Sequence, residues 1–145
     1  MKFLARKFAV TTLVLGLSMA ASAEQNPLVA ERWKTRPVVV VVPRKDDSLL
    51  AKIQATLEAP AGREAFRERE MVLYTVVSGK GSRNGKPLPA EQTRALLQAL
   101  QMEAPRPATL VLVGKDGEIK MTEGTDVDLQ TVFAEIDRMP MRQKR

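Results

Sequence analysis

Runs of apolar residues recur along the chain, and three of them predict the strands of a central sheet. Five consecutive valines over 38–42 have no polar alternation, which is typical of a strand buried on both faces. Similar runs over 71–77 and 109–113 predict two more strands. An Asp-Gly turn at Asp116 then predicts a hairpin back to a short fourth strand over 118–121.

Between these runs, apolar residues recur at helical spacing and proline or glycine ends each segment. The first helix has Asp46 or Asp47 as its cap. The glycine-rich stretch 78–86 predicts a loop. The predicted helices run from Asp46 or Asp47 to a break at Pro60 and Gly62, over 63–70, from Pro89 to a break at Pro105, and from a cap at Asp126 to Pro140.

The order of these elements is β-α-β-α-β-β-α, an α/β arrangement. The two βα units require right-handed crossovers between parallel strands, and a hairpin and a closing helix follow. This order resembles the thioredoxin-like fold, a mixed four-stranded sheet flanked by helices. Another small α/β sandwich built from the same elements is the alternative.

The chain divides into a short leader, one domain and a tail. Residues 1–23 have a basic start, an apolar run and the small-residue site Ala21-Ser22-Ala23, which predicts a secretory signal peptide cleaved after Ala23. A polar N-terminal segment over 24–36 precedes the domain over 37–142, and a basic tail covers 143–145. We therefore expect a periplasmic or secreted protein without a membrane span.

Cleavage changes the charge of the protein. The full chain carries 23 basic and 17 acidic residues, and the predicted signal peptide holds three of the basic ones and no acidic one. The remaining 20 basic and 17 acidic residues give a net charge of +3, which is ordinary for a domain of this size. Aromatic residues are too few for a base-stacking surface, so nucleic-acid binding is not expected.

The chain contains no cysteine and no histidine. Thiol nucleophiles, disulfides, thiol redox cycles, thiolate metal sites and imidazole bases are therefore excluded. The paired methionines Met139 and Met141 are soft ligands for Cu(I), but Met139 continues the apolar stripe of a helix and core packing explains it. We expect no metal, no cofactor and no catalytic residue.

The segment 107–119 resembles the proline-strand-turn-strand segment of thioredoxins and peroxiredoxins. In those families the proline is cis and lies beside the active cysteine, which follows the first strand. The matching region here, over 43–48, offers Ser48 and no thiol, and no histidine is available to activate that serine. The resemblance therefore implies the fold without its redox chemistry.

A wider resemblance covers nearly the whole chain after the signal peptide. Short motifs carry it: Asn26-Pro27-Leu28, Arg32-Trp33, Arg36-Pro37-Val38-Val39-Val40, Arg69-Glu70-Met71-Val72-Leu73-Tyr74, Val113-Gly114-Lys115-Asp116-Gly117 and Ile136-Asp137-Arg138-Met139-Pro140-Met141-Arg142. They resemble the bacterial domain-of-unknown-function family 4174, which is similar to peroxiredoxin-like domains of vertebrate secreted matrix proteins. The resemblance implies a thioredoxin-like fold and export, and it supplies no catalytic residues.

Basic side chains are the candidates for ligand binding. Arg44 and Lys45 follow the first strand, and ligands of open α/β sheets collect outside strand ends. Lys80, Arg83 and Lys86 lie in a glycine-rich segment between a strand and a helix, as phosphate loops do, although the P-loop order is absent. A solvated loop is the alternative reading of that segment.

Two hypotheses about function follow. The first is an exported, non-catalytic thioredoxin-like domain that binds an unknown protein partner. The second is a binder or enzyme for an anionic small molecule that uses Arg44, Lys45, Lys80, Arg83 and Lys86. A homo-oligomeric envelope component is a further, structural alternative. Trp33, between two arginines, is either a partner-binding anchor or a side chain folded back over the sheet.

Overall fold

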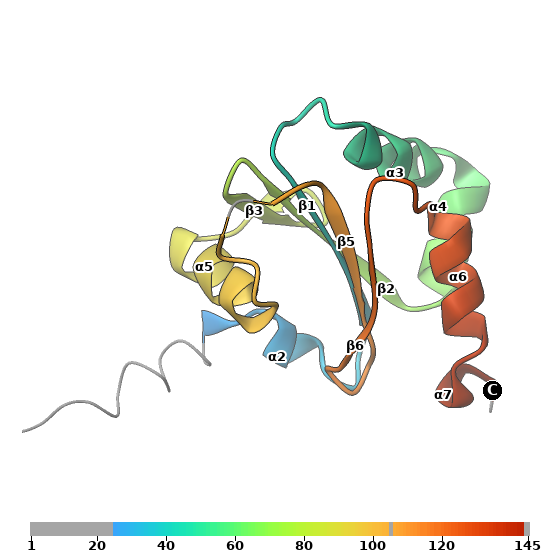
Figure 1. Ribbon diagram of the computed structural model, residues 1–145. Helices are drawn as coiled ribbons and strands as arrows, with labels where there is room; N and C mark the ends of the chain where they lie inside the picture. The colour runs from blue at the N-terminus through green and yellow to red at the C-terminus, as the bar shows by residue number, and fades with distance from the viewer. Residues whose placement is uncertain (1–24, 105, 144–145) are drawn as a thin grey trace, which may run out of the picture.

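The computed structural model describes residues 25–104 and 106–143, in which helices and strands alternate along the chain (Figure 1). The predicted signal peptide over 1–23 and the last two residues of the predicted tail lie outside the described residues. The strands are β1 (Arg36–Val42), β2 (Met71–Val77), β3 (Lys80–Arg83), β4 (Lys86–Pro87), β5 (Thr109–Val113) and β6 (Ile119–Glu123). The helices are α2 (Leu28–Glu31), α3 (Ser48–Glu58), α4 (Pro60–Glu68), α5 (Ala90–Ala99), α6 (Leu129–Asp137) and α7 (Pro140–Gln143).

The strands form one mixed sheet in the order β4-β3-β2-β1-β5-β6. Strands β1 and β2 are parallel, and the other neighbouring pairs are antiparallel. The α/β class with flanking helices is confirmed, whereas the predicted count of four strands is wrong for the described chain. The loop predicted over 78–86 contains β3 and β4, because Asn84 and Gly85 both adopt positive φ and turn the chain back as a hairpin.

The valine strand β1 divides the core into two layers. Val38, Val40 and Val42 belong to one buried cluster, which they share with residues of α3 and α6. Val39, on the opposite face, belongs to the other cluster with Leu28 and residues of α5. Helices therefore cover both faces (Figure 1), as the unbroken apolar run predicts.

The predicted cap of the first long helix is confirmed, whereas other helix ends differ from the sequence prediction. Asp47 caps α3 and accepts a hydrogen bond of 2.9 Å from the backbone N–H of Leu49. Pro60 begins α4 and does not simply end α3, because proline fits the first turn of a helix. Asp128 caps α6 where Asp126 was expected, and Pro140 begins α7 where a stop was expected.

The N-terminal segment also contributes structure. The helix α2 lies in the predicted polar segment, and Leu28 anchors it in the core. The bond before Pro107 is trans, since no described peptide is cis, unlike the proline that this segment resembles. Within the described residues, no helix combines the length and apolar character that crossing a membrane requires.

Candidate functional site

Two of the predicted binding residues lie in the loop after β1. Arg44 is highly exposed and approaches the equally exposed Asp46 at 3.5 Å, and Lys45 is exposed beside it. Lys80 is also exposed at the start of β3, where it pairs with Val77 at the carboxyl end of β2. These three cations therefore lie toward the same end of the sheet.

The other two predicted residues lie further along the β3–β4 hairpin. Arg83 pairs in register with Tyr74, three residues before the end of β2, and Lys86 lies opposite Arg83. None of the five predicted residues lines the main cavities of the described chain. The geometry thus separates them into two groups, and the hypothesis of a common anion site stays a prediction.

Arg83 takes part in a polar cluster that ties α2 to the sheet. Its Nε donates a hydrogen bond of 2.7 Å to Oε1 of Glu31, and the buried Tyr74 hydroxyl donates one of 3.0 Å to the same oxygen. The hydroxyl of Thr35 donates to Oε2 of Glu31. The Glu31 carboxylate is buried, so these donors compensate for the water that it loses.

This cluster shifts the pKa values of its members. Burial raises the pKa of Glu31, but the hydrogen bonds from Arg83, Thr35 and Tyr74 outweigh it, so the pKa is lowered. Burial, together with the negative charge of Glu31, raises the pKa of Tyr74 to about 12. The cluster is a neutralised structural anchor, and it does not present a reactive group to solvent.

We expect the single tyrosine to ionise late in the folded protein. The pKa of Tyr74 is raised from 10.0 in the unfolded chain to about 12 in the folded protein. Between pH 10 and pH 12 the tyrosine therefore ionises more readily in the unfolded state, and this ionisation favours unfolding. Its contribution to stability is therefore full below pH 10 and is lost on the way to pH 12. Tyrosinate absorbance measures this directly, and the urea-unfolded chain provides the control. Ionisation of the folded protein near the unfolded value would contradict the prediction.

The start of α3 follows β1, and the sequence resemblance to thioredoxins would place a reactive thiol there. Here the Asp47 carboxylate accepts a hydrogen bond from the backbone N–H of Leu49, and Ser48 is exposed. A mostly apolar cavity of about 360 Å³ lies nearby, between the ends of β1 and β2 and the segment around Met102. This end of the sheet therefore offers space but no thiol.

The best-formed cavity lies at the opposite end of the sheet, and we call it the α7 pocket. Its volume is about 430 Å³. Three segments far apart in the sequence build it: the first residue of β1, the β5–β6 turn and the α6–α7 junction. The lining residues are Arg36, Gly114, Lys115, Asp116, Lys120, Glu135, Arg138, Met139, Pro140 and Met141.

Cations and methionines share this lining. Lys115 forms an ion pair with Glu70, and Lys120 donates a hydrogen bond of 2.8 Å to Asp116 and so lowers the pKa of that carboxyl. The buried Arg36 donates a hydrogen bond of 2.9 Å to the backbone oxygen of Arg69. The pocket thus combines fixed charge with an apolar wall, which suits a ligand that has both characters.

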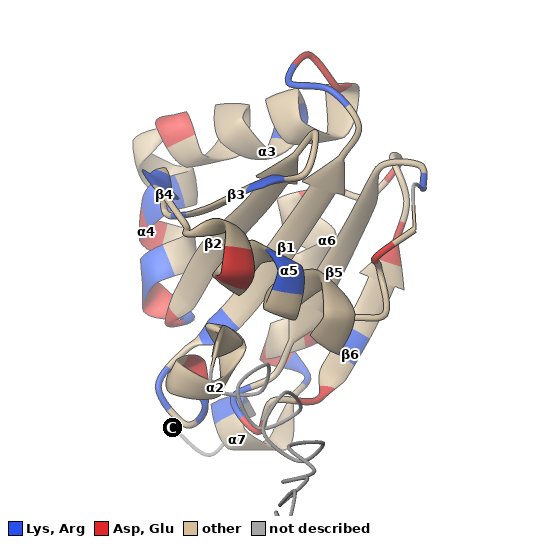
Figure 2. Ribbon diagram, turned by 90° about the vertical axis from the view of Figure 1, so that its left-hand side faces the viewer, with Lys and Arg blue, Asp and Glu red and all other residues tan. Residues whose placement is uncertain are grey.

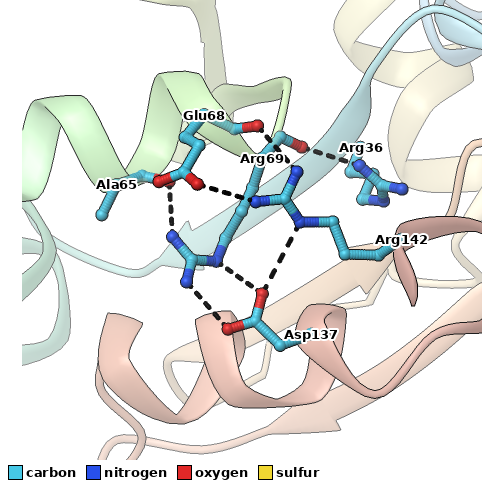
Figure 3. A network of polar contacts seen from close by, with 6 residues as sticks. All are labelled: Arg36, Ala65, Glu68, Arg69, Asp137 and Arg142. Atoms are coloured by element: carbon cyan, nitrogen blue, oxygen red, sulfur yellow. Dashed lines mark hydrogen bonds and ion pairs between the residues drawn. The ribbon is translucent and has the colours of Figure 1, made fainter. Parts of the chain in front are cut away.

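A network of arginines and carboxylates holds the α7 wall in place (Figure 3). Arg142, on α7, donates hydrogen bonds of 3.2 and 3.1 Å to the backbone and side-chain oxygens of Glu68 on α4. Arg69 donates two, of 3.0 and 2.8 Å, to the carboxylate of Asp137 on α6, and a third of 2.9 Å to the backbone oxygen of Ala65. The short helix α7 is therefore fastened to two other helices.

The segment after α2 packs against the β5–β6 turn at this same end. The backbone N–H of Trp33 donates a hydrogen bond of 2.7 Å to the oxygen of Lys115, and the Arg32 side chain lies over Gly117. Helices α2 and α7 lie at one end of the sheet in both views (Figures 1 and 2). The side chain of Trp33 is 66% exposed, so it does not fold back over the sheet.

Substitution of Gly117 by alanine is expected to lower the free energy of unfolding by about 1 to 2 kcal/mol. Gly117 has a φ of +85°, and an added Cβ would lie 2.6 Å from Nε of Arg32. Urea unfolding measures the loss. Gly124 has open space around it and no positive φ, so alanine there is the matched control and should be nearly neutral. Equal losses at both glycines would contradict this reading of the turn.

The family model described as Domain of unknown function (DUF4174) matches residues 27–145. The chain belongs to this family. The residues matched by the DUF4174 model include all three segments that form the α7 pocket. No curated protein and no solved structure matches the chain.

The sequence prediction missed the main features of this DUF4174 site. Among the described residues, no cluster of acidic side chains is suited to hold a metal ion. Arg36 follows a polar segment and gives no sign of burial in the sequence, and the Asp-Gly turn accounts for Asp116 without a role in binding. The one available signal was the set of motifs shared with the family, since Arg36, Lys115 and the stretch from Arg138 to Met141 all belong to them.

Proposed function

We propose that the protein is an exported, non-catalytic binding module with a thioredoxin-like core, and that it binds a protein partner at the α7 pocket. The signal-like sequence over 1–23 supports export. The strand order β2-β1-β5-β6 supports the core, because it combines two parallel strands with an antiparallel hairpin and a closing helix. The β3–β4 hairpin is then an addition at the β2 edge.

One observation carries this proposal: the most clearly formed pocket lies at the end of the sheet opposite to the end where thioredoxins have their active site. The end where thioredoxins keep their thiol has a helix N-terminus already capped by Asp47, and the chain has no cysteine. The opposite end has the α7 pocket, whose walls come from three distant segments and are held by the arginine network. The charged side chains that line this pocket are held in ion pairs, for example Lys115 with Glu70 and Lys120 with Asp116. This arrangement supports binding more than turnover.

Selection of random peptides displayed on phage, with the purified protein as the bait, tests the proposal. We expect enriched peptides whose affinity falls about tenfold in the Met141→Ala variant, because that methionine forms part of the pocket wall. Leu97→Ala is the matched control, since Leu97 lines the cavity at the other end and should leave affinity unchanged.

Two results would overturn the proposal. One is enrichment of peptides that bind equally well to Met141→Ala and more weakly to Leu97→Ala, which would move the site to the other end of the sheet. The other is reproducible turnover by the purified protein in reductase, peroxidase or hydrolase assays. Enrichment of no peptide at all would also count against a peptide-binding module.

A further inference from the structure

Trp33 combines a strained backbone conformation with an exposed aromatic side chain. Its backbone has a φ of +66°, a left-handed conformation that is uncommon for a bulky residue. Its indole side chain is 66% exposed. Glu70, which pairs with Lys115 of the α7 pocket, also has a positive φ of 54°, and so do Ser78, Asn84 and Gln101 elsewhere in the described chain. Among these residues Trp33 alone combines the strained backbone with an exposed aromatic side chain.

The backbone around Trp33 is held firmly although its side chain is exposed. The N–H groups of Lys34 and Thr35 each donate a hydrogen bond of 3.0 Å to the backbone oxygen of Glu31, whose side chain is the centre of the buried cluster. Trp33 itself donates to Lys115, and Arg32 packs over the neighbouring turn. An exposed aromatic side chain on such a fixed support loses little entropy when it binds, which favours affinity.

Two cations flank the tryptophan, and we call Arg32, Trp33 and Lys34 the basic tip. Both cationic side chains are exposed, and neither forms an ion pair with a residue in the described part of the chain. Most other cations at this end have a carboxylate partner, for example Lys115 with Glu70. The tip therefore offers positive charge that a negatively charged partner can neutralise.

We propose that the basic tip and the α7 pocket form one docking surface for an acidic peptide segment of a protein partner. The tip contacts the segment's carboxylates, and an apolar side chain of the segment enters the pocket against Met139 and Met141. Lys115 joins the two parts, because its backbone oxygen accepts the hydrogen bond from the N–H of Trp33 and the same residue lines the pocket. This inference rests on the proposed function and adds the chemical class of the partner.

A peptide fits this surface better than an anionic membrane does. Carboxylates of Asp116 and Glu135 line the pocket, and Glu118 is exposed on the adjacent turn. A negatively charged lipid surface would be repelled by all of these carboxylates together. A peptide can place its own carboxylates near the cations of the tip and keep them away from the carboxylates of the pocket. The pocket volume of about 430 Å³ is also within the range that accepts side chains or small ligands.

The test uses the peptides enriched by phage display, made as synthetic peptides and titrated by isothermal calorimetry. We expect them to carry several acidic residues and at least one large apolar residue. Trp33→Gly should weaken their binding about tenfold or more. Glycine accepts positive φ, so this variant should fold with at least the original stability. A purely structural role of Trp33 would instead lower stability and leave affinity unchanged.

The charge of the tip is tested by the double substitution Arg32→Glu and Lys34→Glu. Arg44→Glu with Lys45→Glu is the matched control, because it makes the same charge change in an exposed basic pair at the opposite end of the sheet. Only the tip variant should lose affinity about tenfold, and the original affinity should fall as salt is raised.

Several outcomes would overturn the inference. The enriched peptides could depend on Met141 and yet lack acidic residues, or bind equally well to the tip variants. Either result would agree with the proposed function and contradict an acidic partner. Equal losses in both charge-reversed variants would indicate a nonspecific charge effect. Binding to phosphatidylglycerol vesicles that depends on Trp33, without affinity for acidic peptides, would assign the surface to a membrane. A dimer that Trp33→Gly dissociates would assign it to a second copy of the chain.

Discussion

Substitution of Glu31 by alanine is expected to lower the free energy of unfolding by about 3 kcal/mol. The variant removes the common acceptor of Arg83, Tyr74 and Thr35. The Tyr74 hydroxyl is then left without its acceptor in a fully buried position, and Arg83 loses its counter-charge. The helix α2 also loses its main polar contact with the sheet. Equilibrium unfolding in urea, with an unchanged dependence on denaturant, measures the effect.

A matched control separates this cluster from a general loss of negative charge. Glu118 has a side chain that is 75% exposed, and its ion pair with Lys120 is at the surface, so Glu118→Ala should change stability by less than about 0.5 kcal/mol. A double-mutant cycle with Tyr74→Phe should give a coupling energy of about 1 kcal/mol or more with Glu31→Ala. Zero coupling, or equal effects of the two glutamate variants, would refute the role assigned to the cluster.

The central strands were predictable because their apolar runs are visible in the local sequence, whichever strands lie beside them. The runs over 71–77 and 109–113 coincide with β2 and β5, and the valine run lies within β1. Burial on both faces selects β-branched residues whatever the neighbouring strand is. The α/β class follows from these runs and from the helical spacing between them.

The β3–β4 hairpin was missed because its residues are mostly polar. Only Gly81 among the residues of β3 and β4 is buried, where it packs beside Thr93. The pairing is driven by the open edge of β2, which the local pattern does not reveal. The dipeptide Asn84-Gly85 was an available signal, since it favours the tight turn of a two-residue hairpin.

The two polar assemblies were unpredictable for a different reason. Glu31 meets partners 43 and 52 residues away in sequence, and Arg69 meets one 68 residues away. Charged residues normally lie at the surface, so a glutamate or arginine in a polar stretch gives no sign that it is buried. Their environment is fixed only once β1 and β2 pair and bring α2, α4 and α6 to their places.

Substitution of Arg69 by alanine is expected to lower the free energy of unfolding by about 2 to 3 kcal/mol. The guanidinium joins α4 to α6 by its paired hydrogen bonds to Asp137, and it lies 4.7 Å from the centre of the Phe133 ring. Its side chain is only 15% exposed, so alanine also leaves apolar surface uncovered. Urea unfolding measures the loss. Hydrogen exchange should show earlier opening of α7, whose Arg142 shares Asp137 at 3.8 Å.

Two comparisons decide whether geometry or charge accounts for this loss. Arg67 is 78% exposed and pairs only with Glu64 one turn away, so Arg67→Ala should cost less than about 0.5 kcal/mol. Arg69→Lys keeps the charge but cannot form the paired hydrogen bonds together with the bond to Ala65, so it should recover less than half of the loss. Full recovery by lysine would mean that charge alone matters. Equal losses at Arg67 and Arg69 would mean that α4, and not its contact with α6, is what the substitution weakens. The second result would remove the role that we assign to Arg69 in fastening α6 and α7 to α4.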